Sequence, residues 1–71
     1  MPFHTVIKNI RLNSFLSQTE FAEKLGVSFT TVNRWENGKA VPNLKARKAI
    51  DAFCKENKID YDVRELNNSD I

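Results

Sequence analysis

Two short segments near the middle of the chain, residues 17–26 and 28–38, each begin with a serine and end with a glycine. A serine before a helix can accept a hydrogen bond from a backbone amide of the first turn, which otherwise lacks a partner. Glycine adopts without strain the left-handed conformation that commonly follows a last turn. Glu20 stands three residues after Ser17, which is the spacing of a capping box. The pattern therefore predicts two short helices joined by a tight turn.

The spacing of apolar residues predicts two more helices, over residues 5–13 and 43–56. In each segment the apolar residues recur every three or four positions, so they gather on one side of a helix with about 3.6 residues per turn. They are Phe3, Val6, Ile7 and Ile10 in the first segment and Ala46, Ala49, Ile50 and Phe53 in the second. The expected fold class is all-α, a bundle of four to five helices.

The chain divides into a helical domain, residues 1–56, and a C-terminal segment, residues 57–71. In this segment Ile59, Tyr61 and Val63 alternate with charged residues, which is typical of a short strand, although residues 63–66 could instead form a helical turn. The apolar residues either dock on the first and last helices or form an edge that pairs with a second chain. A linker with a frayed end is the third alternative.

Charge is unevenly distributed along the sequence. Residues 1–50 contain eight Lys and Arg but three Asp and Glu, a net charge of +5, whereas residues 51–71 carry a net charge of −3. A basic body suits a domain that binds a polyanion, although ordinary solvated surface charge explains it equally well. Cys54 is the only cysteine and no apolar run approaches the roughly 20 residues of a membrane span, so a cytoplasmic protein without membrane contact is expected.

The helix within residues 28–38 has one apolar side and one polar side. Val32 and Trp35 fall together on a helical wheel and form the side that faces the core. The opposite side consists of Thr30, Asn33, Arg34 and Asn37. An ordinary solvent-facing side would contain more Lys and Glu, whereas Arg can pair with guanine and Asn with adenine through two hydrogen bonds each. The polar side therefore predicts contacts with DNA bases, and chance polar residues beside a helix cap are the alternative.

The two central helices and their turn form a helix-turn-helix, which places its second helix in the major groove of DNA. Gln18 lies in the first turn of the preceding helix, where the positive end of the helix dipole favours the sugar-phosphate backbone; a plain surface glutamine is the alternative. The run LSQTEFAEKLGVSFTTVNRWENGK, residues 16–39, resembles the Xre/Cro-type helix-turn-helix family of phage repressors, and the similarity extends from about Ile7 to Phe53. It implies a lambda-repressor-like fold.

The resemblance also implies roles for individual residues. DNA base contacts are expected from Phe29, Thr30, Asn33 and Arg34. Phosphate contacts are expected from Gln18, Ser28, Asn37, Lys39 and Lys45. A pair between Arg11 and Glu36 is expected to tie the first helix to the end of the recognition helix, which Val32 and Trp35 anchor in the core. Phe29 stands where family members often have a polar residue, so it either contacts a thymine methyl group or a sugar, or packs.

Residue types that support catalysis are scarce. His4 is the only histidine, the chain has two glycines, and no Cys/His cluster could hold a metal, so no enzyme activity, cofactor or metal is expected. The expected function is sequence-specific binding of double-stranded DNA by a transcriptional regulator of bacterial or phage type, as a weak or DNA-dependent homodimer. The alternatives are a DNA-targeting module of a longer protein and a protein-interaction domain that retained the fold.

Overall fold

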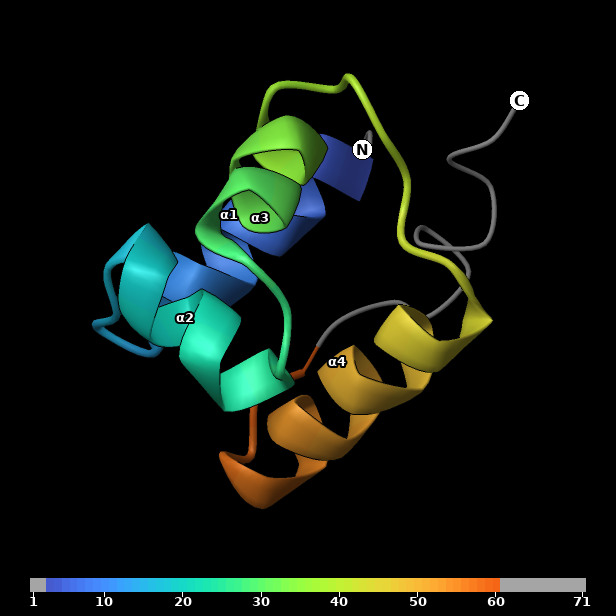
Figure 1. The fold of residues 1–71 in the computed structure, drawn as a ribbon. Coiled ribbons are helices and arrows are strands. Elements are labelled where there is room, and N and C mark those ends of the chain that lie inside the picture. Colours follow the sequence, from blue (N-terminus) through green and yellow to red (C-terminus); the bar gives the residue numbers. More distant parts are fainter. Residues whose placement is uncertain (1–2, 61–71) are drawn as a thin grey trace.

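The computed structural model describes residues 3–60, which fold into four α-helices (Figure 1). Their bounds are α1 Phe3–Asn13, α2 Gln18–Leu25, α3 Phe29–Glu36 and α4 Leu44–Glu56. The all-α fold class is therefore confirmed. None of these helices is long and apolar enough to cross a membrane within the described range.

Two of the predicted helix starts were wrong by a small margin. α1 begins at Phe3, two residues before the predicted start, and Phe3 is buried with the other apolar residues of this helix. α4 begins at Leu44, one residue after the predicted start, because Asn43 is the N-cap: its side-chain oxygen accepts a hydrogen bond from the Ala46 amide at 2.8 Å. Asparagine is among the strongest N-cap residues, so the cap explains why the helix starts there.

The ends of the helices share one backbone pattern within residues 3–60. After each helix comes a residue with positive φ, and the next amide donates to a carbonyl five residues back, which is the hydrogen bond of a Schellman motif. The positive-φ residues are Phe15, Gly26, Gly38 and Lys58, at 59°, 74°, 72° and 56°. The amides that close the motif belong to Leu16, Val27, Lys39 and Ile59, at 2.9 to 3.3 Å from their acceptors. The two glycine stops are therefore where the sequence predicts them.

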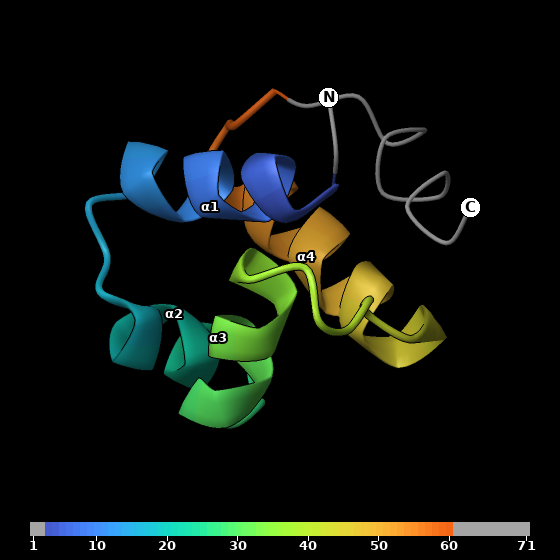
Figure 2. The ribbon, with the colours of Figure 1, turned by 90° about the horizontal axis from the view of Figure 1, so that it is seen from above.

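The core lies where the four helices of residues 3–60 meet, and α2 and α3 each contact two other helices. α3 contacts both α1 and α2, and α2 also contacts α4 (Figures 1 and 2). The rings of Phe21 in α2 and Phe53 in α4 pack edge to face, with centroids 5.4 Å apart and planes at 79°. This is a favourable arrangement for aromatic pairs. The buried apolar residues are Phe3, Val6, Ile7, Ile10, Phe21, Ala22, Leu25, Val32, Trp35, Ala46, Ile50, Phe53 and Cys54.

Of the predicted C-terminal segment, residues 57–71, the structure describes residues 57–60. Ile59 is half-buried and packs against the core just after α4, and it belongs to no helix or strand. The predicted strand through Tyr61 and Val63, the helical turn over residues 63–66 and the frayed end lie outside the described residues. The packing of Ile59 agrees with docking at the first position of this segment.

Candidate nucleic-acid interface

Side-chain caps fix the start of both helices in the helix-turn-helix. Ser17 Oγ accepts from the Glu20 amide at 3.1 Å, and Glu20 Oε1 accepts from the Ser17 amide at 2.8 Å, so the capping box is complete. The hydrogen bond from the Ser17 backbone amide, followed by the Ser17 side chain, lowers the pKa of the Glu20 carboxyl. Ser28 Oγ accepts from the Thr31 amide at 3.1 Å and caps α3. The caps therefore fix the residues at which α2 and α3 begin.

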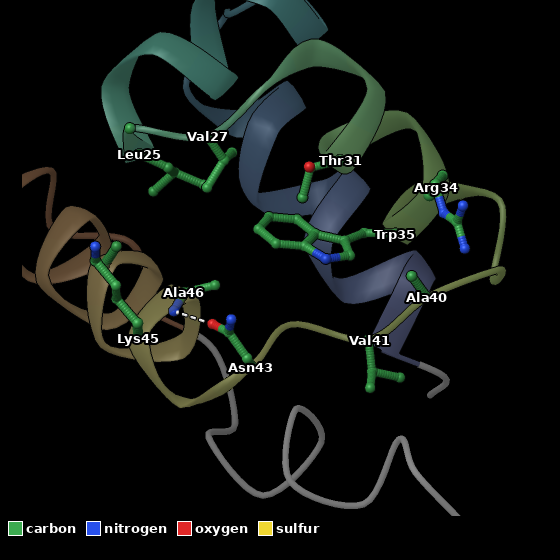
Figure 3. A pocket seen from close by; sticks show the side chains of 12 residues that line it. Leu25, Val27, Thr31, Arg34, Trp35, Ala40, Val41, Asn43, Lys45 and Ala46 are labelled. Atoms are coloured by element: carbon green, nitrogen blue, oxygen red, sulfur yellow. Dashed lines mark hydrogen bonds between the residues drawn. The ribbon is translucent and has the colours of Figure 1, made fainter.

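The inner side of α3 is anchored by two buried residues. Val32 is fully buried and Trp35 is 2% exposed. Figure 3 shows the Trp35 ring reaching from α3 into a groove between α3 and the start of α4, toward Ala46. Arg34, the preceding residue, is exposed and lies at the edge of the same groove, across from Lys45 (Figure 3). The anchor therefore determines which side of α3 remains available to a partner.

The other side of α3 is open to solvent and carries no exposed carboxylate. Thr30, Arg34 and Asn37 are exposed, and Asn33 is half-buried at the edge toward α2. Phe29 leaves 49% of its surface exposed. Glu36 is the only acid in α3, and its side chain is 4% exposed. This side consequently offers hydrogen-bond donors, hydrogen-bond acceptors and one cation to a ligand, and it places no exposed negative charge against an anion.

The carboxylate of Glu36 is neutralised by Arg11 of α1. Arg11 Nε donates to Glu36 Oε2 at 2.7 Å and Arg11 Nη2 donates to Glu36 Oε1 at 3.0 Å, so the pair is bidentate. Arg11 Nη1 also donates to the Leu16 carbonyl at 3.0 Å. The hydrogen bonds to Glu36 raise the pKa of the Arg11 guanidinium. The pair that the resemblance implies is present, and it ties α1 and the α1–α2 turn to the end of α3.

A chain of side-chain hydrogen bonds leads from this ion pair to the surface of α3. Gln18 Nε2 donates to Glu36 Oε1 at 3.0 Å, Asn33 Nδ2 donates to Gln18 Oε1 at 3.2 Å, and Asn37 Nδ2 donates to Asn33 Oδ1 at 3.0 Å. We call these three amides and the Glu36 carboxylate the amide chain. Gln18 is thus half-buried between α2 and α3, rather than a side chain facing only outward as its position in the first turn predicts.

The lysines expected at phosphates lie at the edges of the site. Lys39 is exposed just after α3, and its backbone amide donates to the Arg34 carbonyl at 2.9 Å. Lys45 is exposed in the first turn of α4. Lys45 and Arg34 both line the groove beside Trp35 but lie on opposite sides of it (Figure 3). Ser28 is exposed, and its hydroxyl is 2.9 Å from that of Thr31 in addition to capping α3.

Comparisons with known proteins agree with this geometry. The family model described as Helix-turn-helix matches residues 7–56, which include all of α2 and α3. This chain belongs to the helix-turn-helix family. A relative from Enterococcus faecalis, the HTH-type transcriptional activator BcrR, is 38% identical over 53 residues, which are 75% of this chain and 26% of the relative. The chain thus spans about a quarter of the length of that relative. No solved structure was found to match the chain.

The expected membership in the Xre/Cro-type helix-turn-helix family is therefore confirmed. In this helix-turn-helix protein, the Arg11–Glu36 pair and the burial of Val32 and Trp35 agree with what was expected from the sequence. The amide chain was not expected. A signal for it was present, because Gln18, Asn33 and Asn37 are all amides within the motif. Which of them touch depends on how α2 lies on α3, and that is decided by packing.

The side chains of residues 3–60 form no group that could hold a metal ion, and their one thiol is buried. No group of three or more His, Cys, Asp or Glu side chains in this range could hold a metal ion. Cys54 is buried in the core of the helix-turn-helix domain, and burial, with a smaller effect from Asp51, raises its pKa from 9.0 to about 11. A thiol in this environment stays protonated at neutral pH, which makes it a poor nucleophile.

Proposed function

We propose that this chain binds double-stranded DNA sequence-specifically by placing α3 in the major groove. The observation that carries the proposal is the composition and exposure of the open side of α3. It presents Thr30, Asn33, Arg34 and Asn37, while the only acid of the helix is buried against Arg11. DNA carries one negative charge on each phosphate, so an interface free of exposed carboxylates avoids electrostatic repulsion.

The proposed contacts divide between bases and phosphates. Arg34 and Asn33 have the groups for bidentate recognition of guanine and adenine, Thr30 can bond to a base edge, and Phe29 can touch a thymine methyl group. Phosphate contacts are proposed for Gln18, Ser28, Asn37, Lys39 and Lys45, with the first turn of α2 contributing its backbone dipole. Phosphate contacts fix the position of the protein on the duplex, and base contacts select the sequence.

We further propose that this DNA binding serves transcription regulation, because the Enterococcus faecalis relative is named a transcriptional activator. Binding to DNA in the cytoplasm of a bacterial-type cell, as a weak or DNA-dependent homodimer, fits a motif that reads few base pairs alone. No catalytic role is part of the proposal. A protein-interaction domain with the same fold remains the competing function, and it predicts no preference among DNA sequences.

Two single substitutions test the division between base and phosphate contacts. Arg34→Ala should weaken binding to the best duplex by about 1–3 kcal/mol and relax preference at one or two base pairs, because a bidentate base contact is lost. Lys39→Ala should weaken binding to all duplexes nearly alike. The measurement is selection from a random duplex pool followed by titration of single-base variants. Identical profiles for the two variants would contradict the proposed use of the open side of α3.

A further inference from the structure

The amide chain has a fixed direction, which is set by Glu36. A carboxylate can only accept hydrogen bonds, so the end of the Gln18 amide that faces Glu36 must be its NH2 group. The distance from Gln18 Nε2 to Glu36 Oε1 is 3.0 Å, and the Glu36 side chain is 4% exposed. Turning the amide over would place its oxygen against a buried carboxylate. The oxygen of Gln18 therefore faces away from Glu36.

The orientation of Gln18 then decides that of Asn33. Because Gln18 presents an oxygen, Asn33 must present its NH2 group, as the 3.2 Å distance between Asn33 Nδ2 and Gln18 Oε1 shows. The Asn33 oxygen is left on the other side, where Asn37 Nδ2 donates to it at 3.0 Å. Each amide in the series donates inward, toward the carboxylate, so the buried charge determines the orientation of an amide on the open side of α3.

Asn33 keeps the capacity to read a base in this orientation. An asparagine side chain has two N–H donors and two oxygen lone pairs, and the amide chain uses one of each. The remaining donor and acceptor are the pair that an adenine requires, since its N7 accepts and its N6 amino group donates. The amide chain thus leaves an adenine-reading group whose NH2 end lies toward α2 and whose oxygen lies toward Asn37.

We infer that Gln18 is a positioning residue for sequence recognition: it holds the Asn33 amide in one orientation, and Asn33 in that orientation selects adenine. This inference rests on the proposed DNA binding and deepens it. It also differs from a purely phosphate-contacting role for Gln18, because a phosphate contact carries no sequence information. The two roles make opposite predictions about what a substitution at Gln18 does to base preference.

Gln18→Lys separates the two roles. A lysine ammonium can donate to Glu36 and to a phosphate, but it has no acceptor for Asn33. Thr19→Lys is the matched control, because Thr19 is exposed, lies next to Gln18 in the first turn of α2 and acquires the same added charge. The base pair that Asn33 reads is identified first as the one whose preference is lost in Asn33→Ala. Circular dichroism confirms that each variant is folded.

The wild-type protein should prefer adenine at that base pair by on the order of ten- to a hundredfold over the other bases. Gln18→Lys should reduce this preference to about threefold or less while leaving preferences at the Arg34 base pairs in place, and Thr19→Lys should keep the adenine preference. An adenine preference that survives Gln18→Lys, or a wild-type preference for another base at this position, overturns the inference. A wild-type protein that selects no sequence at all defeats the proposed function instead.

A second measurement needs no DNA. In the free protein, ¹⁵N relaxation should show that the Asn33 side-chain NH2 group is rigid, because hydrogen bonds hold both the nitrogen and the oxygen of this amide. Gln18→Lys should make that group mobile and shift its NMR signals, whereas Thr19→Lys should do neither. An Asn33 amide that is equally mobile in all three proteins would show that Gln18 does not hold it, whatever the DNA experiment gives.

Discussion

Trp35 and Arg34 are adjacent in the sequence, yet the Trp35 ring is buried while the Arg34 side chain extends in a different direction and is exposed (Figure 3). The helical spacing alone is enough to separate them, because successive residues are about 100° apart around the axis and Val32 identifies the inner side. The degree of burial could not be read from the spacing. At 2% exposure Trp35 is a core residue, and the groove beside it is lined by residues of both α3 and the start of α4.

Replacing Trp35 should therefore affect folding before it affects binding. Trp35→Ala removes a buried indole and leaves a cavity, which typically costs about 3–5 kcal/mol. A domain of this size has a net stability of about 3–5 kcal/mol, so the variant should be largely unfolded by circular dichroism at 25 °C. Thr30→Ala, on the open side of the same helix, should fold normally. A folded Trp35→Ala protein that only fails to bind DNA would contradict the assigned inner side.

Cys54 gives a prediction that depends on pH. Its thiol has a pKa raised from 9.0 to about 11 in the folded protein by burial, so the unfolded chain loses this proton first as pH rises. Stability from this group is complete below pH 9 and declines as pH rises through about 11. The free energy of unfolding by urea should fall more between pH 8 and pH 10.5 in the wild type than in Cys54→Ala. An equal fall in both proteins would contradict the buried, protonated thiol.

At the scale of the helices, the starts are easier to predict from the sequence than the ends. Ser17, Ser28 and Asn43 all cap helices in the structure, because their short polar side chains reach the first-turn amides from a fixed position. Two of the four stops within residues 3–60 are glycines and were predictable. The other two, Phe15 and Lys58, adopt the same left-handed backbone without the residue type that favours it. Packing of the adjacent helices fixes those turns, and no local sequence pattern predicts them.

Phe15 consequently stores conformational strain that a substitution should release. A non-glycine residue in the left-handed region costs roughly 1–2 kcal/mol, and Phe15 is 93% exposed, so its side chain offers little packing in return. Glycine would remove the strain at an entropic cost of about 0.5–1 kcal/mol in the unfolded chain. Phe15→Gly should thus stabilise the domain by up to about 1 kcal/mol in urea denaturation.

Phe15→Ala is the control for this effect, because it removes the aromatic ring but keeps the side-chain carbon responsible for the strain. It should change stability by less than about 0.5 kcal/mol in either direction. If Phe15→Gly is instead destabilising while Phe15→Ala is neutral, the left-handed turn after α1 is not the conformation that limits this segment. If both are strongly destabilising, the exposed ring makes a contact that the described residues do not show.

At the scale of the whole molecule, the fold assembles the buried ion pair, the amide chain and the polar side of α3 from three helices. α1 supplies Arg11, α2 supplies Gln18, and α3 supplies Glu36 and the open polar side. The all-α fold class, the inner side of α3 and the family were all predictable, because they follow from local periodicity and from one contiguous motif. The amide chain was not predictable, because Gln18 is 15 residues from Asn33 and 18 residues from Glu36 in the sequence. Gln18 meets these residues only when α2 packs on α3.

The charge distribution links this assembly to DNA. The buried pair keeps the Glu36 carboxylate away from a ligand, so Arg34, Lys39 and Lys45 are the charged groups that the described site offers to phosphates and bases. Arg11 is committed to Glu36 and is therefore not counted among the phosphate contacts. Each phosphate neutralised by a cation releases counterions, so the salt dependence of the affinity for DNA reports the number of phosphates neutralised.

The salt dependence of duplex binding tests the central claim most directly. Affinity for a selected duplex and for a random duplex should be measured by titration between about 50 and 200 mM salt. The logarithm of the affinity should fall with the logarithm of salt with a slope of about −1.8 per domain, about −0.9 each for Lys39 and Lys45, and Lys39→Ala should reduce the magnitude of the slope by about 0.9. The selected duplex should stay tighter than the random one at every salt concentration. A flat salt response, or equal affinity for both duplexes throughout, would contradict sequence-specific DNA binding by this domain.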